Sequence, residues 1–471
     1  MLNCKIKYSI LLTILFSMGS CKKLVEVSSP VTSLTKYSVY QNDATAAAVL
    51  TGLYADMSAN KSFIEGATSN IYLGLCSDEL TLLNDATDLN DIRFYRNELN
   101  SQSAPNFWLR LYNRIFTVNS ALEGLNATTT LSSAIKQQLL GEAKFIRALC
   151  YFYLVNLYGD IPLALSSDYR LNAKLERISK DFVYDQVITD LKEAEELLTD
   201  KYYAADIFST TGDRVRPTKY AAAALLSRVY LYRQDWSNAL AQADMVINDS
   251  TTYILEPDLN TVFLKESREA IWQLMPIQNA SNNTDAPTLV LVGGPNTYLN
   301  KYYLSNNLLD SMEVGDLRKT SWINVFTDPS GNYYYAYKYK NFSYNVPVTE
   351  YLIVFRLAEQ YLIRAEARAH LGQTELAKSD LNRIRNRAGL ADTDASDEAS
   401  LLAAIMHERK IELFLESGQR WFDLKRTGQA DNVMPAITIA KGGTWQSTDK
   451  LFPIPATDTL YGPNLTQTLG Y

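Results

Sequence analysis

The segment spanning residues 401–428 constrains the fold more than any other stretch, because it is helical in pattern and unusually charged. Apolar residues recur near helical spacing through its first half, which predicts one apolar helix face. Gly418 interrupts this pattern, Trp421 and Phe422 resume it, and Gly428 is the predicted C-terminal stop. A chain with such a segment must fold into a core that accepts an apolar face together with its charges.

The charges of this segment predict a partly buried ionic network. Glu408, Glu412 and Glu416 form an i, i+4, i+8 row, and three acids in one exposed row would repel one another. Buried charges persist only when they are paired and hydrogen-bonded, so we expect these acids to meet arginines. Arg409 is the expected partner of Glu412 or Glu416. The predicted structural network consists of Arg409, Glu412, Glu416, Arg420 and Asp423.

The run ERKIELFLESGQRWFDLKR within this segment resembles the signature of the SusD/RagB family of outer-membrane nutrient-binding lipoproteins. An Arg, two Glu, a Gly-x-Arg and a Trp-x-Asp ending recur in that signature. Further stretches resemble the family in order along the chain. They are the Trp-x-x-x-Tyr-x-x-Ile helix that starts at Trp108, the GDLRKTSWI and YYYAYKY runs, and the C-terminal LFPIPATDTLYGPNLTQTLGY. The resemblance covers nearly all of the chain after residue 20.

Residues 1–20 have the layout of a bacterial lipoprotein signal peptide. Lys5 and Lys7 form a positive region, the following apolar core is too short to span a membrane, and the sequence MGSC ends at Cys21 like a lipobox. The alternative is a plain secretory signal that happens to contain Cys21. We expect cleavage before Cys21 and lipidation of this residue. Acyl chains would then hold the protein on a membrane surface without a span.

The rest of the chain is predicted to be mostly α-helical. By pattern it divides into residues 21–250 and residues 251–471, which we expect to form one compact unit. Apolar periodicity predicts four helical hairpins. Two turns, RQDWSNAL and LGQTELAK, align with each other and share the Ala expected at a helix–helix contact, which is tetratricopeptide-like. The uneven spacing predicts a helical-hairpin scaffold with long loop insertions and a few short strands, and the resemblance implies the same fold.

Three stretches are predicted to be non-helical. Residues 65–106 are rich in Gly, Asn, Asp and Ser and are expected to be loops. The run EAIWQLMPI alternates like a strand. The two prolines of LFPIP predict an extended C-terminus.

Two groups of residues are the predicted ligand-binding site. A sugar ring has apolar C–H faces and polar rims, so its site needs a flat aromatic side chain beside amides, acids or arginines. Both groups lie in expected loops, and we expect them to converge on one exposed face because loops on a rigid scaffold commonly carry binding. Ordinary loop polarity and tyrosine packing are the alternative reading. The residues are Asn84, Asp88, Arg93 and Tyr95 in the first group, and Tyr298, Tyr302 and Trp322 in the second.

Composition excludes several classes of function. The net charge is −7 with acids and bases mixed, which does not indicate nucleic-acid binding. Two His residues argue against a His-rich metal site, and no phosphate-binding loop or other cofactor motif is present. Cys76 and Cys150 are expected to be buried free thiols, because their spacing carries no disulfide signature. No catalytic residue, metal or cofactor is predicted.

The resulting hypothesis is a lipid-anchored binding protein on the exterior of an outer membrane. The resemblance implies that it captures a glycan or oligosaccharide and delivers it to a TonB-dependent, SusC-like β-barrel transporter. A tetratricopeptide-like adaptor that binds peptides or proteins is the second hypothesis. A glycoside hydrolase is the third, with Glu412 and Glu416 as the formal carboxylate pair, although carboxylates beside arginines are more typical of ion pairs.

Overall fold

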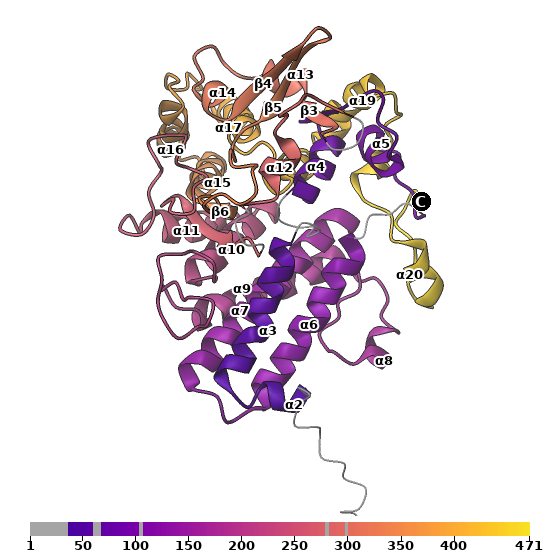
Figure 1. The fold of residues 1–471 in the computed structure, drawn as a ribbon, viewed down its shortest axis with the longest axis vertical. Coiled ribbons are helices and arrows are strands. Elements are labelled where there is room, and N and C mark those ends of the chain that lie inside the picture. The colour runs from indigo at the N-terminus through magenta and orange to yellow at the C-terminus, as the bar shows by residue number, and fades with distance from the viewer. Residues whose placement is uncertain (1–35, 60–66, 103–106, 278–281, 297–299) are drawn as a thin grey trace, which may run out of the picture.

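The computed structural model describes residues 36–59, 67–102, 107–277, 282–296 and 300–471. The predicted signal peptide, Cys21 and Tyr298 lie outside these residues. Figure 1 shows a mostly helical molecule, with long helices stacked at one end and several of the short strands at the other. Among the described residues, no helix has the length and apolar character needed to cross a membrane.

The scaffold is a series of packed helical hairpins, which confirms the prediction from apolar periodicity. Consecutive helices pack on one another along the series, and the two self-similar hairpins lie side by side because α11 packs on α15. The hairpin helices are α6 (Phe107–Ala127), α7 (Ser133–Tyr158), α9 (Lys180–Leu197), α10 (Lys219–Tyr232), α11 (Trp236–Ile247), α15 (Leu357–His370) and α16 (Thr374–Arg387).

Further helices connect and cover this scaffold. Before the hairpins come α2 (Lys36–Val39), α3 (Asp43–Ser58), α4 (Ala67–Cys76) and α5 (Leu89–Arg96), and α8 (Tyr169–Asn172) follows α7. The later insertions carry α12 (Asp285–Leu289), α13 (Asn306–Leu309) and α14 (Arg318–Ser321). The C-terminal part contains α17 (Glu398–Glu412), α18 (Gln419–Arg426), α19 (Ala430–Ala440), the 3-10 helix η2 (Ser447–Lys450) and α20 (Ala456–Tyr461).

The described strands form three two-stranded antiparallel sheets. β1 (Leu80–Leu82) pairs with β3 (Tyr302–Leu304), β2 (Ala270–Leu274) with β6 (Leu352–Arg356), and β4 (Ile323–Asp328) with β5 (Gly331–Ala336). The predicted strand in EAIWQLMPI is β2. All five of its residues are buried. Its central residue, Trp272, packs edge-on against Phe145 of α7 at 5.0 Å between ring centroids.

Two of the non-helical predictions are wrong in part. The stretch 65–106 contains α4, β1 and α5 between its loops. Helix α5 is stabilised at its start because Asp88 caps the first turn by accepting hydrogen bonds from the N–H groups of Asn90 and Asp91. At the C-terminus, α20 begins directly after Pro455. A proline is compatible with the start of a helix, because the first N–H groups have no intrahelical partner.

The central segment is two helices and not one interrupted helix. α17 ends at Glu412, and Leu415, Ser417 and Gly418 all have positive φ angles before α18 begins. A Cβ at Gly418 would lie 2.1 Å from Cδ1 of Leu73, so only glycine fits there. Glu416 therefore leaves the helix that carries Glu408 and Glu412. Helix α17 thus ends four residues before Glu416, which the sequence pattern had placed at position i+8 of the same helix. Cys76 and Cys150 are buried thiols and do not form a disulfide, as expected.

Candidate functional site

The pairing of β1 with β3 brings Tyr302, one residue of the second predicted ligand-binding group, close to the first group. Thr81 faces Tyr303 in the register, and the N–H of Leu83 donates to the carbonyl of Lys301 at 2.8 Å. The loop after β1, with the helix α5 that follows, thus lies beside the chain that enters β3. In Figure 1 these elements lie at the same end of the molecule as β4 and β5.

A buried carboxylate joins the two groups. Asp91 of α5 accepts a hydrogen bond from the hydroxyl of Tyr302 at 2.9 Å, and Nζ of Lys301 lies 2.5 Å from the same oxygen. Asp88 is 3.7 Å from Nζ of Lys301. Burial raises the pKa of Asp91, and Lys301 opposes this shift. These contacts hold α5 against the chain that enters β3. The scaffold therefore sets the geometry of the site.

Three half-buried tyrosines form what we call the tyrosine face: Tyr95, Tyr303 and Tyr333. The rings of Tyr303 and Tyr333 meet edge to face at 5.3 Å. Burial raises the pKa of Tyr303, and the neighbouring hydroxyls of Tyr95 and Tyr333 add to this shift. Nζ of Lys441 lies over the ring of Tyr95, 5.0 Å from its centroid. The face therefore combines flat rings with a nearby cation.

Tyr302 is buried and is not the exposed ring that the sequence predicted. Successive side chains of a strand point to opposite faces, so Tyr302 points inward to Asp91 while Tyr303 is half-exposed. Tyr303 and Tyr333 were not among the residues predicted from the sequence. The alternation within YYL and YYYA was the available signal, but its phase depends on which face the core occupies.

The prediction of Trp322 as a ligand contact is contradicted by its burial. Its side chain is fully buried, and its indole N–H donates to the carbonyl of Leu259 at 2.8 Å. Nζ of Lys338 lies 4.9 Å from the ring centroid. Trp322 therefore belongs to the core beneath the site and cannot stack on a ligand from solvent.

The remaining predicted residues lie on α5 and on the loop before it. Asn84 is exposed, Arg93 is half-buried on α5, and Asp88 is exposed while it caps that helix. Burial raises the pKa of Tyr95, whereas contacts with Thr81 and Leu82 oppose the shift, which places its hydroxyl against β1. Arg93 lies two residues before Tyr95 on the helix, so the two side chains point to different sides of α5.

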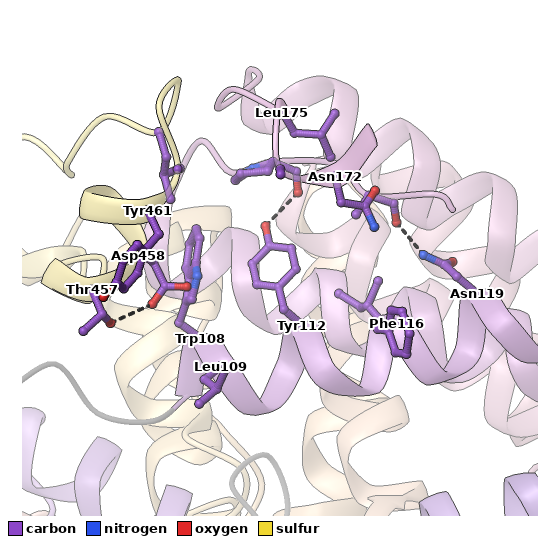
Figure 2. A pocket seen from close by; sticks show the side chains of 16 residues that line it. Trp108, Leu109, Tyr112, Phe116, Asn119, Asn172, Leu175, Thr457, Asp458 and Tyr461 are labelled. Atoms are coloured by element: carbon purple, nitrogen blue, oxygen red, sulfur yellow. Dashed lines mark hydrogen bonds between the residues drawn. The ribbon is translucent and has the colours of Figure 1, made fainter. Parts of the chain in front are cut away.

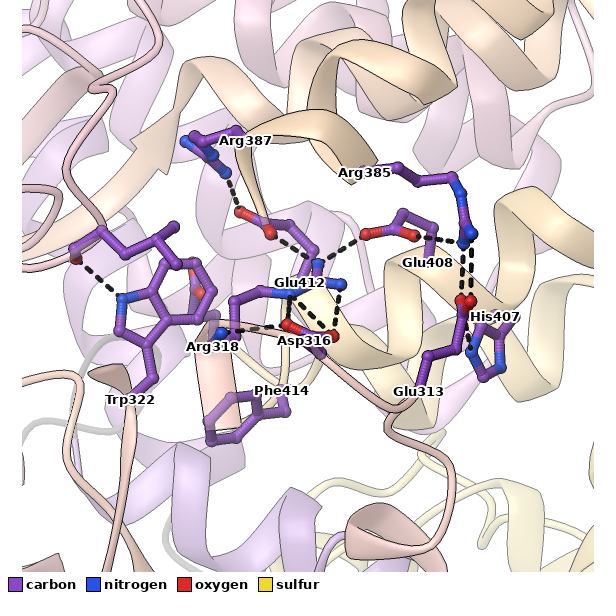
Figure 3. Close-up of polar contacts among 12 residues, drawn as sticks. Glu313, Asp316, Arg318, Trp322, Arg385, Arg387, His407, Glu408, Glu412 and Phe414 are labelled. Carbon is purple, nitrogen blue, oxygen red and sulfur yellow. Dashed lines mark hydrogen bonds and ion pairs between the residues drawn. The ribbon is translucent and has the colours of Figure 1, made fainter. Parts of the chain in front are cut away.

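A buried ionic network lies beneath this end of the molecule (Figure 3). The carboxylate of Glu412 accepts hydrogen bonds from Arg318 at 2.8 Å, Arg356 at 2.6 Å and Arg387 at 2.5 Å. Burial opposes ionisation of Glu412, but the three guanidinium groups outweigh it and hold its pKa below the usual range. Burial raises the pKa of Glu408, although Arg318 donates to it.

Glu416 ties the network to the turn between α17 and α18. It accepts from Nε of Arg356 at 2.7 Å and from Nζ of Lys338 at 2.5 Å. Burial lowers the pKa of Lys338 to about 8, against the opposing effect of Glu416. The two acids Glu412 and Glu416 thus share Arg356.

Arg409 is not the partner of Glu412 or Glu416, contrary to the prediction. Its Nε donates to Asp423 at 2.8 Å, and Arg420 forms a separate fork on Asp78 at 2.7 and 2.9 Å. The break after α17 turns these arginines toward other elements. The five predicted residues are all in ion pairs, but in three clusters.

Glu79, which precedes β1, supplies a pH-dependent prediction. It is buried, and Oε1 accepts from the N–H of Leu415 at 3.1 Å. Burial raises the pKa of Glu79 to about 7. A raised native pKa contributes stability that is complete below about pH 4.5 and is lost as pH rises through 7. Relative to a Glu79→Gln variant, the wild type should lose about 3 kcal/mol of unfolding free energy across this interval.

Urea unfolding at pH 5 and pH 8 measures this difference. The exposed Glu176→Gln is the matched control and should track the wild type at both values. Parallel behaviour of wild type and Glu79→Gln would show that Glu79 is not held in a desolvated site.

A separate hollow of about 500 Å³ lies between α6, α20 and the segment after Pro162 (Figure 2). Its polar groups are engaged within the protein. The hydroxyl of Tyr112 donates to the carbonyl of Pro162 at 2.7 Å, and the side-chain amide of Asn119 donates to the carbonyl of Ala164 at 2.8 Å. Asp458 accepts from Thr457 at 3.2 Å. This hollow has apolar walls and few polar groups to offer a hydroxylated ligand.

Together the hairpin scaffold and the strand-bearing end define the class of SusD-like proteins. Two family models match the chain: one described as "Starch-binding associating with outer membrane" over residues 28–231, and one described as "SusD family" over residues 300–471. The chain belongs to the SusD/RagB family.

Known relatives agree over nearly the full length. The chain is 26% identical to SusD-like protein P2 of Formosa agariphila, with 98% of each chain covered. A SusD superfamily protein from Bacteroides vulgatus superposes with a TM-score of 0.79 at 22% identity, covering 92% of this chain and all of that one. A structure titled "Laminarin binding SusD-like protein" superposes at 0.75 with 23% identity, covering 92% of this chain and 100% of that one.

Proposed function

We propose that this protein captures a glycan on the tyrosine face and delivers it to a TonB-dependent, SusC-like barrel transporter. The observation that carries the proposal is the cluster of half-buried rings that Tyr95, Tyr303 and Tyr333 form beside β1. Flat rings can stack on the C–H face of a sugar, while the exposed Asn84 of the loop after β1 can bind its hydroxyls. The family membership and the laminarin-binding relative support the same ligand class.

A binding role also agrees with the state of the two acids that a hydrolase would need. Glu412 and Glu416 are both committed to arginine and lysine partners below the surface. Catalytic carboxylates must flank a substrate bond, and these side chains cannot reach one without breaking the network. We therefore propose a binding protein and not an enzyme.

Replacing Tyr303 by Ala tests the ligand site. We expect glycan affinity to fall by about 5- to 150-fold, or on the order of 1–3 kcal/mol, as for truncation of a binding hot spot. The melting temperature should change little, because the ring is half-exposed. Calorimetric titration against glycan and peptide panels measures the effect, with the exposed Tyr169→Ala of α8 as control. Binding to peptides alone would favour the adaptor function, and unchanged affinity in Tyr303→Ala would exclude this face.

A further inference from the structure

A second pocket, of about 600 Å³, lies on the helical scaffold away from the tyrosine face. It forms where the turn between α10 and α11 meets the end of α15 and the helices α17 and α18. Gln234 and Trp236 of the first self-similar turn line the pocket. His370, the residue before the second self-similar turn, also lines it. The repeated hairpins thus build a hollow of the size that small ligands usually occupy.

An aromatic pair forms one wall of this pocket. Trp236, the first residue of α11, stacks on His370, the last residue of α15, at 3.9 Å between ring centroids and 18° between planes. Both side chains are half-buried and line the pocket. Nδ1 of His370 lies 3.3 Å from Glu398, which restrains the imidazole. The indole is therefore a fixed ring at the edge of a hollow.

The charged groups of the lining are matched to each other and leave no net charge for a ligand. Arg426 donates to both oxygens of Glu366, at 2.6 and 2.8 Å, and its Nε donates to Asp423 at 2.6 Å. Met406 and Leu402 add apolar surface beside this pair. An anionic ligand such as a phosphate would find its cation already occupied, so the pocket fits a neutral molecule.

Uncharged polar groups lie around the opening. The exposed amide of Gln234 has no side-chain partner among the described residues. Gln429 and Thr427 also line the pocket, but the side-chain oxygen of Gln429 accepts from Asn432 at 3.2 Å and the hydroxyl of Thr427 donates to the carbonyl of Asp423 at 2.7 Å. An aromatic wall with the amide of Gln234 at its edge is the chemistry that binds a ring with one apolar face and hydroxyls around it.

We propose that the pocket between Trp236, His370 and Met406 is a second binding site for a neutral sugar ring. Its ligand class rests on the proposed glycan function, but its location does not depend on the tyrosine face. A single glycan chain could place one sugar unit in the first site and another sugar unit in the second. Alternatively, two glycan chains could bind at once. The two sites are separable by mutation, because no residue is shared between them.

Fluorine NMR of the 5-fluorotryptophan-labelled protein tests the proposal directly. The chain has six tryptophans, of which Trp108, Trp272, Trp322 and Trp421 are buried, while Trp445 is partly exposed outside the pocket. The Trp236 resonance is assigned from a Trp236→Phe variant. The probes are the methyl pyranosides of glucose, galactose, mannose and xylose, titrated into the millimolar range.

We expect at least one pyranoside to shift the Trp236 resonance saturably while that of Trp445 stays in place. Gln234→Ala should weaken this response several-fold, and Tyr303→Ala should leave it unchanged. Absence of a saturable shift with all four sugars, or an equal response to the neutral aromatic benzyl alcohol, would overturn the second sugar site. Loss of glycan binding at the tyrosine face with the Trp236 response intact would instead count against the proposed function alone.

Discussion

Replacing Arg356 by Ala is expected to lower the free energy of unfolding on the order of 3–5 kcal/mol. Arg356 is fully buried and donates to Glu269 at 2.8 Å, to Glu412 at 2.6 Å and to Glu416 at 2.7 Å. Without its guanidinium, these carboxylates lose a shared partner in a site that water does not reach. The cost arises mainly from the uncompensated charge that remains and much less from the value of the pairs themselves.

Chemical denaturation monitored by circular dichroism measures this change. Arg170→Ala is the matched control, because Arg170 forms a solvent-exposed pair with Asp168 at 2.7 Å and should contribute little to stability. Arg356→Lys keeps the charge but loses the forked geometry, so its stability should lie between those of the wild type and the Ala variant. If Arg356→Ala were as stable as Arg170→Ala, the buried network would not be a structural element.

Replacing Cys21 by Ala is expected to abolish lipidation completely. The residue follows a signal-like segment in a lipobox context, and acyl chains are the proposed means by which the protein stays on the outer membrane. Metabolic labelling with a fatty acid should mark the parent and not the variant, and the variant should move to the soluble fraction.

Cys4→Ala is the control for this experiment, because Cys4 lies in the segment that cleavage would remove. It should be labelled like the parent. An unlabelled parent would mean that the N-terminus is a plain secretory signal. Equal labelling of the parent and Cys21→Ala would contradict lipidation of Cys21 and place the acyl group elsewhere in the chain.

The long hairpin helices were predictable from the sequence, whereas the place of the ligand site stays a prediction. Apolar periodicity is a local property, so α6, α7, α15 and α16 were recognisable without knowledge of their neighbours. The loop after β1 and Tyr302 lie close together, as expected, but Trp322 lies in the core. Helix α5 was missed because its many polar residues hide a short helix that capping and packing stabilise.

By itself the sequence determined where the long hairpin helices lie, that the acids near Glu412 must be paired, and which family the chain resembles. Tertiary structure alone decided which partners these acids have. Arg318 and Arg356 come from distant elements, and no local spacing identifies them. It also decided that Tyr303 is half-exposed while Tyr302 and Trp322 are buried. The physical reason is that a sequence pattern shows how often side chains return to the same face of a strand or helix. Which of those faces is buried depends on where the core lies, and only the tertiary structure decides that.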